Sequence, residues 1–362
     1  MQGFVAAMYL VLFAASSTFS SHRIVAASPT YNVINYGATG IGVHDDTQAF
    51  VKAWGDARGD SGAQGTPTLV VPGGKKFLLS PASFEGPCKS SSIIVQIDGT
   101  LAAPSSLSEW KGCHADSWLV FQNVANLNFK GSGQVDGQGS LWWGGAKALA
   151  FSSCTNLVLS GLHHINSPRN HISIIHCDGG TISNLQITAP ETSPNTDGID
   201  ISSTNRLNIH DLDIQTGDDC IAINGGTSNV NITGLFCGPG HGIRIKTWQG
   251  GSGYAKNIVY NQITLSAVKN PIIIDQFYDP GLAQKNEASS VVVSDVRFTG
   301  FRGTSASDEA ITLSCSSVGC SDIKLDNIQI TSSTPGKGVT ASCKNAHGSA
   351  TLTTPPVSCL LP

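Results

Sequence analysis

Four segments of five residues align without gaps and determine the fold of this 362-residue chain. They read Asn170-His-Ile-Ser-Ile174, Asp197-Gly-Ile-Asp-Ile201, Asp219-Cys-Ile-Ala-Ile223 and His241-Gly-Ile-Arg-Ile245, and their first residues lie 27, 22 and 22 positions apart. Isoleucines at the third and fifth positions alternate with other residues, as in a strand that buries one face. A strand that recurs at this interval indicates coils stacked on one another.

A second set of short apolar segments recurs with a similar period. The last apolar residues of these segments are Leu162, Leu185, Leu212, Leu235, Ile263, Val296 and Ile328. A period of twenty to thirty residues without intervening helices is typical of a β-solenoid, in which each coil buries its apolar face on the next. We therefore predict an all-β, parallel β-helix. A β-sandwich is the competing all-β fold, but it predicts no such register.

The composition agrees with many short strands and excludes several other classes of protein. Charged residues make up 13% of the chain, about half the usual share, and there are 40 glycines. This excludes a coiled coil, a disordered chain rich in charge and a nucleic-acid binder with a basic surface. Because the net charge is only −4, any anionic partner must be held by local cations.

The two ends of the chain carry their own signals. Residues 1–27 resemble a signal peptide, with an apolar run followed by small residues; a membrane anchor is the alternative, but the run is too short to span a bilayer. We expect residues 28–362 to form one domain. Asp45-Asp46-Thr47 opens an expected capped, amphipathic helix that reaches Trp54 and covers the first coil. The stretch after Pro335 is expected to be stapled by Cys343 and Cys359.

The chain contains ten cysteines, and an even number behind a secretion signal favours disulfides. No two of them form a C-x-x-C pair, which argues against a zinc site. We expect no metal and no cofactor.

The four aligned segments place Asn170, Asp197, Asp219 and His241 in one column, because strands of adjacent coils pair about 4.8 Å apart. Such a column can be purely structural, since Asn and Asp stacks cap turns in solenoids. Two carboxylates and a histidine beside Asp218, however, cost electrostatic energy unless the protein uses them. The chemistry that suits them is glycoside hydrolysis, with one carboxyl as proton donor and another activating water. Inverting enzymes hold their two carboxyls roughly 6.5–9.5 Å apart, a span that one to two coil spacings plus the reach of the side chains can supply.

Several motifs extend this interpretation into a family resemblance. They are Ser193-Pro-Asn-Thr-Asp-Gly-Ile-Asp200, Gly217-Asp-Asp-Cys220, Cys237-Gly-Pro-Gly-His-Gly242 and Arg244-Ile-Lys246. The set resembles the signature motifs of plant polygalacturonases, the pectin-degrading glycoside hydrolases, and the likeness runs from about Tyr31 to Gly348. The resemblance implies a right-handed parallel β-helix that hydrolyses α-1,4 bonds between galacturonates with inversion and without a cofactor.

The resemblance also implies roles for individual residues. Asp218 is the general acid, Asp197 and Asp219 activate water, and His241 supports protonation of the acid.

Two cations and two cysteines complete what the resemblance implies. Arg244 and Lys246 bind galacturonate carboxylates, and a polyanionic substrate in an acid-lined cleft needs cations there. Cys220 and Cys237 resemble a disulfide that ties the two active coils together; a pair of buried thiols is the alternative.

The chain departs from the family pattern at one point. In the family a full coil separates the Gly-His-Gly-Ile strand from the Arg-Ile-Lys strand, whereas here Ile243 is followed directly by Arg244. Because the apolar alternation continues across the join, we expect the solenoid to fold. Arg244 and Lys246 then move about 4.8 Å toward the aspartates and share a strand with His241.

Two hypotheses follow for the function. The first is a secreted polygalacturonase of the cell wall, a monomer that acts on pectin or polygalacturonate and binds neither nucleic acid nor membrane. The second is a folded, catalytically impaired β-helix that at most binds pectin, because misplacement by about 1 Å can cost about a hundredfold in rate.

Overall fold

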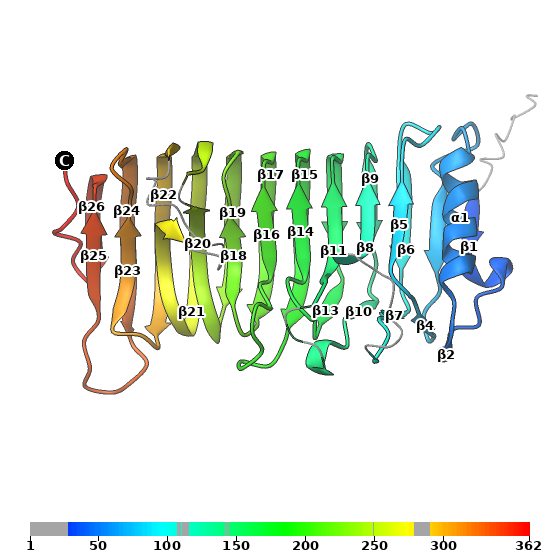
Figure 1. The fold of residues 1–362 in the computed structure, drawn as a ribbon, viewed down its shortest axis with the longest axis horizontal. Coiled ribbons are helices and arrows are strands. Elements are labelled where there is room, and N and C mark those ends of the chain that lie inside the picture. The colour runs from blue at the N-terminus through cyan, green and yellow to red at the C-terminus, as the bar shows by residue number, and fades with distance from the viewer. Residues whose placement is uncertain are drawn as a thin grey trace, which may run out of the picture.

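The computed structural model describes residues 28–106, 110, 116–141, 143, 145–248, 250–278 and 290–362. The expected signal peptide, residues 1–27, lies outside the described residues. The described chain winds into an elongated right-handed parallel β-helix, with its strands side by side along the long axis (Figure 1). The predicted fold is therefore confirmed.

The described strands form three parallel ladders along the axis. The first contains β5 (Ala82–Glu85), β8 (Ser117–Gln122), β11 (Lys147–Ser152), β14 (Ile172–Ile175), β16 (Ile199–Ser202), β18 (Asp219–Ile223), β20 (Gly240–Trp248), part of β21 (Ser252–Tyr278), β23 (Glu309–Ser314) and β25 (Thr340–Lys344). The second contains β1 (Thr30–Asn32), β3 (Thr68–Val71), β6 (Ile93–Ile97), β9 (Leu127–Lys130), β12 (Thr155–Ser160), β15 (Asp178–Thr188), β17 (Asn205–Gln215), β19 (Thr227–Cys237), the rest of β21, β22 (Ser290–Ser305), β24 (Cys320–Ser332) and β26 (Ala346–Thr354). The third contains β2 (Ile41–Asp45), β4 (Lys76–Leu78), β7 (Thr100–Ala102), β10 (Gln134–Asp136) and β13 (His163–Ile165), and it joins the second at β15.

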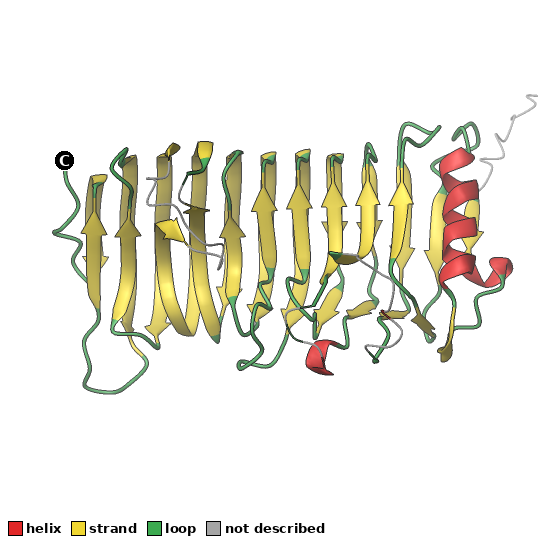
Figure 2. Cartoon of the chain, in the orientation of Figure 1, coloured by secondary structure: helices red, strands yellow, loops and turns green. Residues whose placement is uncertain are grey.

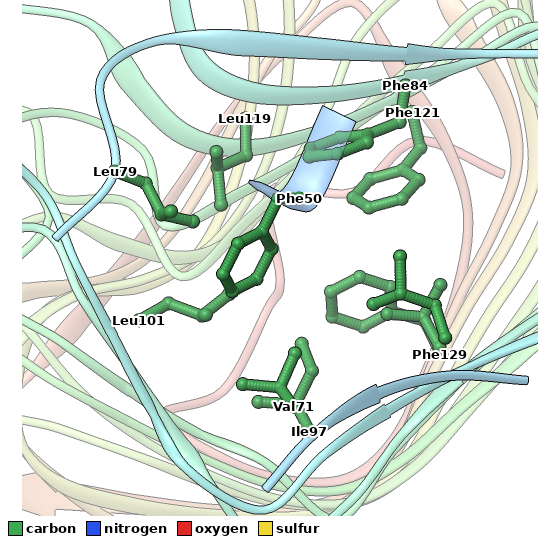
Figure 3. A pocket seen from close by; sticks show the side chains of 11 residues that line it. Phe50, Val71, Leu79, Phe84, Ile97, Leu101, Leu119, Phe121 and Phe129 are labelled. Carbon is green, nitrogen blue, oxygen red and sulfur yellow. The ribbon is translucent and has the colours of Figure 1, made fainter. Parts of the chain in front are cut away.

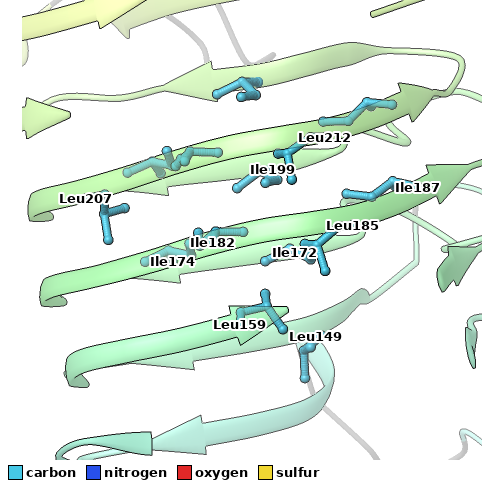
Figure 4. Close-up of a cluster of buried hydrophobic side chains, with 14 of the residues drawn as sticks. Leu149, Leu159, Ile172, Ile174, Ile182, Leu185, Ile187, Ile199, Leu207 and Leu212 are labelled. Carbon is cyan, nitrogen blue, oxygen red and sulfur yellow. The ribbon is translucent and has the colours of Figure 1, made fainter. Parts of the chain in front are cut away.

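The core is a continuous stack of apolar side chains inside the coils. In the first ladder Ile199 pairs with Ile221, Ile221 with Ile243, Ile243 with Ile272 and Ile272 with Ile311, and each is at most 1% exposed. Figure 4 shows the same inward direction for neighbouring coils. Full burial of one such side chain contributes about 1.5–3 kcal/mol. The repeated isoleucines therefore hold successive coils in register.

A helix covers the N-terminal end of the stack (Figure 2). Helix α1 (Thr47–Gly59) contacts β1, β3 and β5, and the short 3-10 helices η1 (Val33–Tyr36) and η3 (Gly139–Leu141) complete the described helical elements. Phe50 of α1 points into the interior, where its ring centroid lies 5.4 Å from that of Phe77 (Figure 3). The helix hides the apolar end of the first coil and blocks edge pairing there.

The predicted helix is confirmed, and it continues to Gly59. The residue before its first turn does not cap it in the usual way. Asp46 occupies the position before the helix without a capping hydrogen bond from its side chain. The Asp45 carboxylate instead accepts a hydrogen bond from the Thr47 amide, and Asp46 accepts from the Thr39 amide. Asp45 therefore accepts from the first residue of the helix, and Asp46 accepts from the loop that precedes it.

Asparagines stack at one turn of the solenoid. Asn156 donates to Asn126 of the preceding coil at 3.0 Å, and Asn257 donates to Asn229 at 3.0 Å. These four residues adopt positive φ angles, which asparagine tolerates better than most residues. These asparagine stacks provide hydrogen-bond partners for the side-chain amides at the turn of successive coils.

The chain closes smoothly at the join between Ile243 and Arg244, where the sequence predicts a missing coil. Strand β20 pairs with β18 on one side, with Ala222 opposite Arg244, and with β21 on the other. The apolar row is unbroken, because Ile243 and Ile245 are each 1% exposed. The expectation that the solenoid folds across this join agrees with the structure.

The described cysteines include both disulfides and thiols. The disulfides are Cys220–Cys237, Cys315–Cys320 and Cys343–Cys359, so the two expected pairings are confirmed. Cys154 and Cys177 are buried thiols in adjacent coils, and Cys88 is a half-buried one. No helix among the described residues is long and apolar enough to cross a membrane.

Candidate active site

Three strands of the first ladder bring the candidate residues together. Asp219 lies opposite His241 in the β18–β20 pairing, and the β16–β18 register places Asp197 beside Asp219. The predicted column is therefore confirmed for these three residues. Asn170 starts the column as predicted, but its side-chain amide donates to Asp200.

Asp218 and His241 form the more accessible part of the site. His241 Nδ1 lies 2.8 Å from Asp218 Oδ1 and 3.6 Å from Asp219 Oδ1. These two acids raise the pKa of His241 to about 9. Burial raises the pKa of Asp218, but the hydrogen bond and charge of His241 outweigh burial and bring it below its ordinary value. At neutral pH the pair therefore holds one proton, mainly on the imidazole.

Lys246 lies between the other two candidate acids. Its Nζ donates to Asp197 Oδ2 at 3.2 Å and to Asp219 Oδ2 at 3.3 Å. Burial alone would lower the pKa of Lys246, but the charges of Asp197, Asp200 and Asp219 raise it above its ordinary value. The lysine is therefore a buried ammonium that joins β20 to β18 and to the segment just before β16.

Three buried carboxyls face this single ammonium. Burial raises the pKa of Asp197 well above the ordinary value, and the charge of Asp200 raises it further. Burial also raises the pKa of Asp200, against the opposing charge of Lys246. Three carboxylates beside one ammonium would repel one another, and this repulsion falls when one of the carboxyls keeps a proton.

Arg244 approaches the acids from the same strand. Its Nε is 3.5 Å from Asp219 Oδ1, and its side chain is 14% exposed. The ring of Tyr278 lies 5.8 Å from the guanidinium carbon and 5.3 Å from Lys246 Nζ. Both cations therefore contact the aspartates, as the loss of one coil led us to expect.

Two residues of the site were not singled out in the sequence. Asp200 lies in a quoted motif, three residues after Asp197, and the strand alternation that turns Ile199 inward could have indicated that it faces outward. Tyr278 is the last residue of β21, and no local sequence pattern predicts its contact with the site. The stacking of distant coils, rather than a motif, brings it there.

The cluster also has the spacing of a possible metal site. Ligand atoms of Asp218, Asp219 and His241 lie within 4.8 Å of one another. Arg244 and Lys246, however, already place two positive charges against Asp219. The donor set therefore suits proton transfer better than capture of a cation.

An uncharged hollow of about 380 Å³ lies at the carboxyl-terminal end of β20, and none of the acids or cations of the cluster lines it. Trp248, two residues after Lys246, is 46% exposed there. Small residues form most of its other walls, including Ser202, Ser203, Gly225, Gly226, Gly251 and Ser252. An exposed indole beside small polar groups is suited to contact with the apolar face of a sugar ring.

Comparison with solved structures supports the architecture. The chain is similar to an exopolygalacturonase from Thermotoga maritima, with a TM-score of 0.68 and 18% identity over 90% of this chain and 92% of that one. It is also similar to an endo-xylogalacturonan hydrolase from Aspergillus tubingensis, with a TM-score of 0.67 and 21% identity over 88% and 100% of the two chains. At these identities the likeness concerns the fold.

Plant sequences are more similar. A probable polygalacturonase of Arabidopsis thaliana is 44% identical over 93% of this chain and 82% of its own length. A polygalacturonase of Persea americana is 40% identical over 87% of this chain and 76% of its own length.

The family model described as glycosyl hydrolases family 28 matches residues 62–243 and, separately, residues 242–354. The two matches meet at the join between Ile243 and Arg244, where the sequence predicts a missing coil. Together with the plant relatives, they cover most of the chain, which therefore belongs to glycosyl hydrolases family 28.

Proposed function

We propose that this protein is a polygalacturonase that hydrolyses α-1,4 bonds between galacturonate residues of pectin or polygalacturonate. The observation that carries the proposal is the cluster of Asp197, Asp218, Asp219 and His241 on one face of a family 28 β-helix. The plant relatives named polygalacturonase support the substrate class.

In the proposed mechanism, Asp218 delivers a proton to the leaving oxygen. His241, 2.8 Å away, supplies that proton to Asp218 as negative charge develops on the sugar oxygen. The pair thus works as one donor, because its proton rests mainly on the histidine before substrate arrives.

Asp197 and Asp219 are the proposed activators of water. They lie on adjacent coils, and burial makes the ionised Asp197 a stronger base by raising its pKa. With the acid on one side of the scissile bond and these carboxylates on the other, attack on the opposite face of the sugar gives inversion.

Arg244 is the proposed contact for a substrate carboxylate. It lies on the strand of His241, and the same strand ends at Trp248, whose hollow offers a surface for a sugar ring. A guanidinium binds a planar carboxylate through two parallel hydrogen bonds. Lys246 was expected to share this role, but its Nζ donates to Asp197 and Asp219.

We further propose that residues 1–27 direct secretion to the cell wall and that the enzyme acts as a monomer without membrane or nucleic-acid partners. The apolar run at the N-terminus and the three disulfides support an oxidising, extracellular setting.

The experiment is to incubate the purified protein with de-esterified polygalacturonate and a chelator, and to measure new reducing ends and product length. Release of saturated monomers or oligomers supports an inverting hydrolase and distinguishes exo from endo attack. No release from a folded protein, beside an active family enzyme, would favour the hypothesis of an impaired β-helix. Asp213→Asn, an acid on β17 outside the site, is the matched control for substitutions of the catalytic acids.

A further inference from the structure

A groove of about 630 Å³ lies on the second ladder, on the outer side of strands β17, β19, β21, β22 and β24. These strands follow one another along the axis (Figure 1), so at a spacing of about 4.8 Å the groove extends over about 19 Å. None of the described residues of β16, β18 and β20 lines it. The groove is therefore separate from the candidate active site and long enough for more than one sugar ring.

Residues with left-handed backbone interrupt the strands at the same point and form one wall of the groove. Gly234, Gln262, Gly300 and Asn327 occupy equivalent positions in successive coils, and each has a positive φ angle. A Cβ atom at Gly300 would lie no closer than 3.5 Å to any atom beyond its chain neighbours. The glycine therefore leaves open space between coils that carry amide side chains.

The next outward position of each strand supplies the floor of the groove. Phe236, Thr264, Arg302 and Gln329 lie opposite one another in successive pairings, and all four line the groove. Phe301 is 1% exposed, so by strand alternation its neighbour Arg302 faces solvent. The row therefore holds an aromatic ring and a guanidinium two strands apart, about 10 Å, with a small side chain between them.

Arg302 is the charged residue among the described residues that line the groove. It is exposed, and no acid of the described chain lies within ion-pair distance of it, whereas Arg244 lies 3.5 Å from Asp219. Asp213, opposite Phe236 on β17, accepts a hydrogen bond from Gln215 and does not line the groove. The guanidinium is therefore available for an external anion.

We propose that this groove is a second binding site for polygalacturonate, which holds one segment of the polymer while another segment occupies the catalytic site. The proposal rests on the function proposed above for the class of its ligand. Phe236 contacts the apolar face of a sugar ring, and Arg302 binds a uronate carboxylate through two parallel hydrogen bonds. The amides of Gln262, Asn327 and Gln329 are donors and acceptors for sugar hydroxyls.

A second site benefits long chains only. A polymer held in the groove stays near the catalytic site, so its next encounter with that site is intramolecular and its effective concentration is raised. A galacturonate trimer cannot occupy both sites at once. The groove should therefore change the affinity for polygalacturonate relative to that for the trimer.

The first test measures binding of long polygalacturonate by calorimetry, with Asp218→Asn as the parent protein to suppress hydrolysis. Arg302→Gln should weaken this binding at least about tenfold, because it removes a charge-assisted pair. Arg297→Gln is the matched control, since Arg297 is exposed on the same strand but does not line the groove. It should bind like the parent.

Two results would overturn the proposal. One is equal binding of polygalacturonate by Arg302→Gln and its parent. The other is an equal loss of binding to galactan, an uncharged polymer, because Arg302 would then not contact a carboxylate. A thermal melt confirms that each variant is folded.

A second variant fills the groove and leaves its charge in place. Asparagine tolerates the positive φ of Gly300, and the equivalent position of the next coil already carries Asn327. Gly300→Asn should therefore fold and should weaken binding of polygalacturonate in the same direction as Arg302→Gln. Unchanged binding would mean that the polymer does not enter the groove.

Kinetics and binding together separate failure of this inference from failure of the proposed function. In an active enzyme, Arg302→Gln should raise the KM for long polygalacturonate relative to that for the trimer, and Arg297→Gln should keep the ratio. Loss of polymer binding in Arg302→Gln supports the second site even in a protein that hydrolyses nothing. Unchanged polymer binding would overturn it even in an active hydrolase.

Discussion

The two faces of strands β16, β18 and β20 differ in how they would respond to the coil that the sequence predicts to be missing. The inward face repeats isoleucine at equivalent positions, so any coil can stack on any other. The outward face carries a different residue on each coil, and removal of one coil would give new neighbours to the residues of the two coils that meet at the join. The core would therefore tolerate a change that rearranges the site, where Lys246 lies 3.2 Å from Asp197.

The largest effect, on turnover, is expected from a substitution on the outward face. Asp218→Asn should lower kcat by about 10²–10⁴-fold, because it removes the proposed proton donor. Reducing-end release from polygalacturonate measures the loss, and a melting curve should show that the fold is retained. Turnover like that of the wild type would disprove the catalytic assignment, whereas Asp213→Asn should remain active.

Restoring a coil tests the comparison directly. Insertion of a family-like coil between Ile243 and Arg244 should move Lys246 away from Asp197 and raise kcat, on the order of a hundredfold if misplacement limits the rate. The measurement is turnover of de-esterified polygalacturonate by both forms. An equal or lower rate after insertion would show that the short cleft functions as it stands.

Substitutions on the inward face should instead lower the stability of the fold, because they remove buried side-chain volume. Ile221→Ala leaves a cavity between fully buried neighbours and should lower the free energy of unfolding by about 2–5 kcal/mol. Denaturant unfolding measures this change. Val158→Ala on β12, whose side chain is 36% exposed, is the control, and an equal effect at both positions would contradict the core assigned here.

A smaller effect is expected where a disulfide ties β19 to β18. Replacing Cys220 and Cys237 together by alanine opens a loop with a sequence separation of 17 and should cost about 3 kcal/mol of stability. Replacing Cys315 and Cys320, only 5 residues apart, should cost less. Denaturant unfolding without reductant compares the two variants, and the reverse order would argue against the loop-entropy explanation.

The difference between the faces also explains what could be predicted from sequence. The alternation around Ile221 and the period of the coils are local patterns, so the solenoid, the strand pairing and the column of Asp197, Asp219 and His241 followed from them. The approach of Arg244 to Asp219 followed from counting coils. The contact of Tyr278 with both cations depends on how β21 bends beyond β20, and no periodic pattern encodes that geometry.

The smallest effect concerns the pH dependence of stability. The pKa of His241 is raised from an ordinary value of 6.5 to about 9, so its protonation stabilises the folded state fully below about pH 6.5 and no longer above about pH 9. His241→Asn should therefore lower Tm by a few degrees at pH 6, and the difference from the wild type should vanish as the pH rises past 9. Melting curves across this range check the sign. A difference that grows with pH would mean that the histidine is neutral in the folded protein, and Asp218 would then need another source for the proton that it donates.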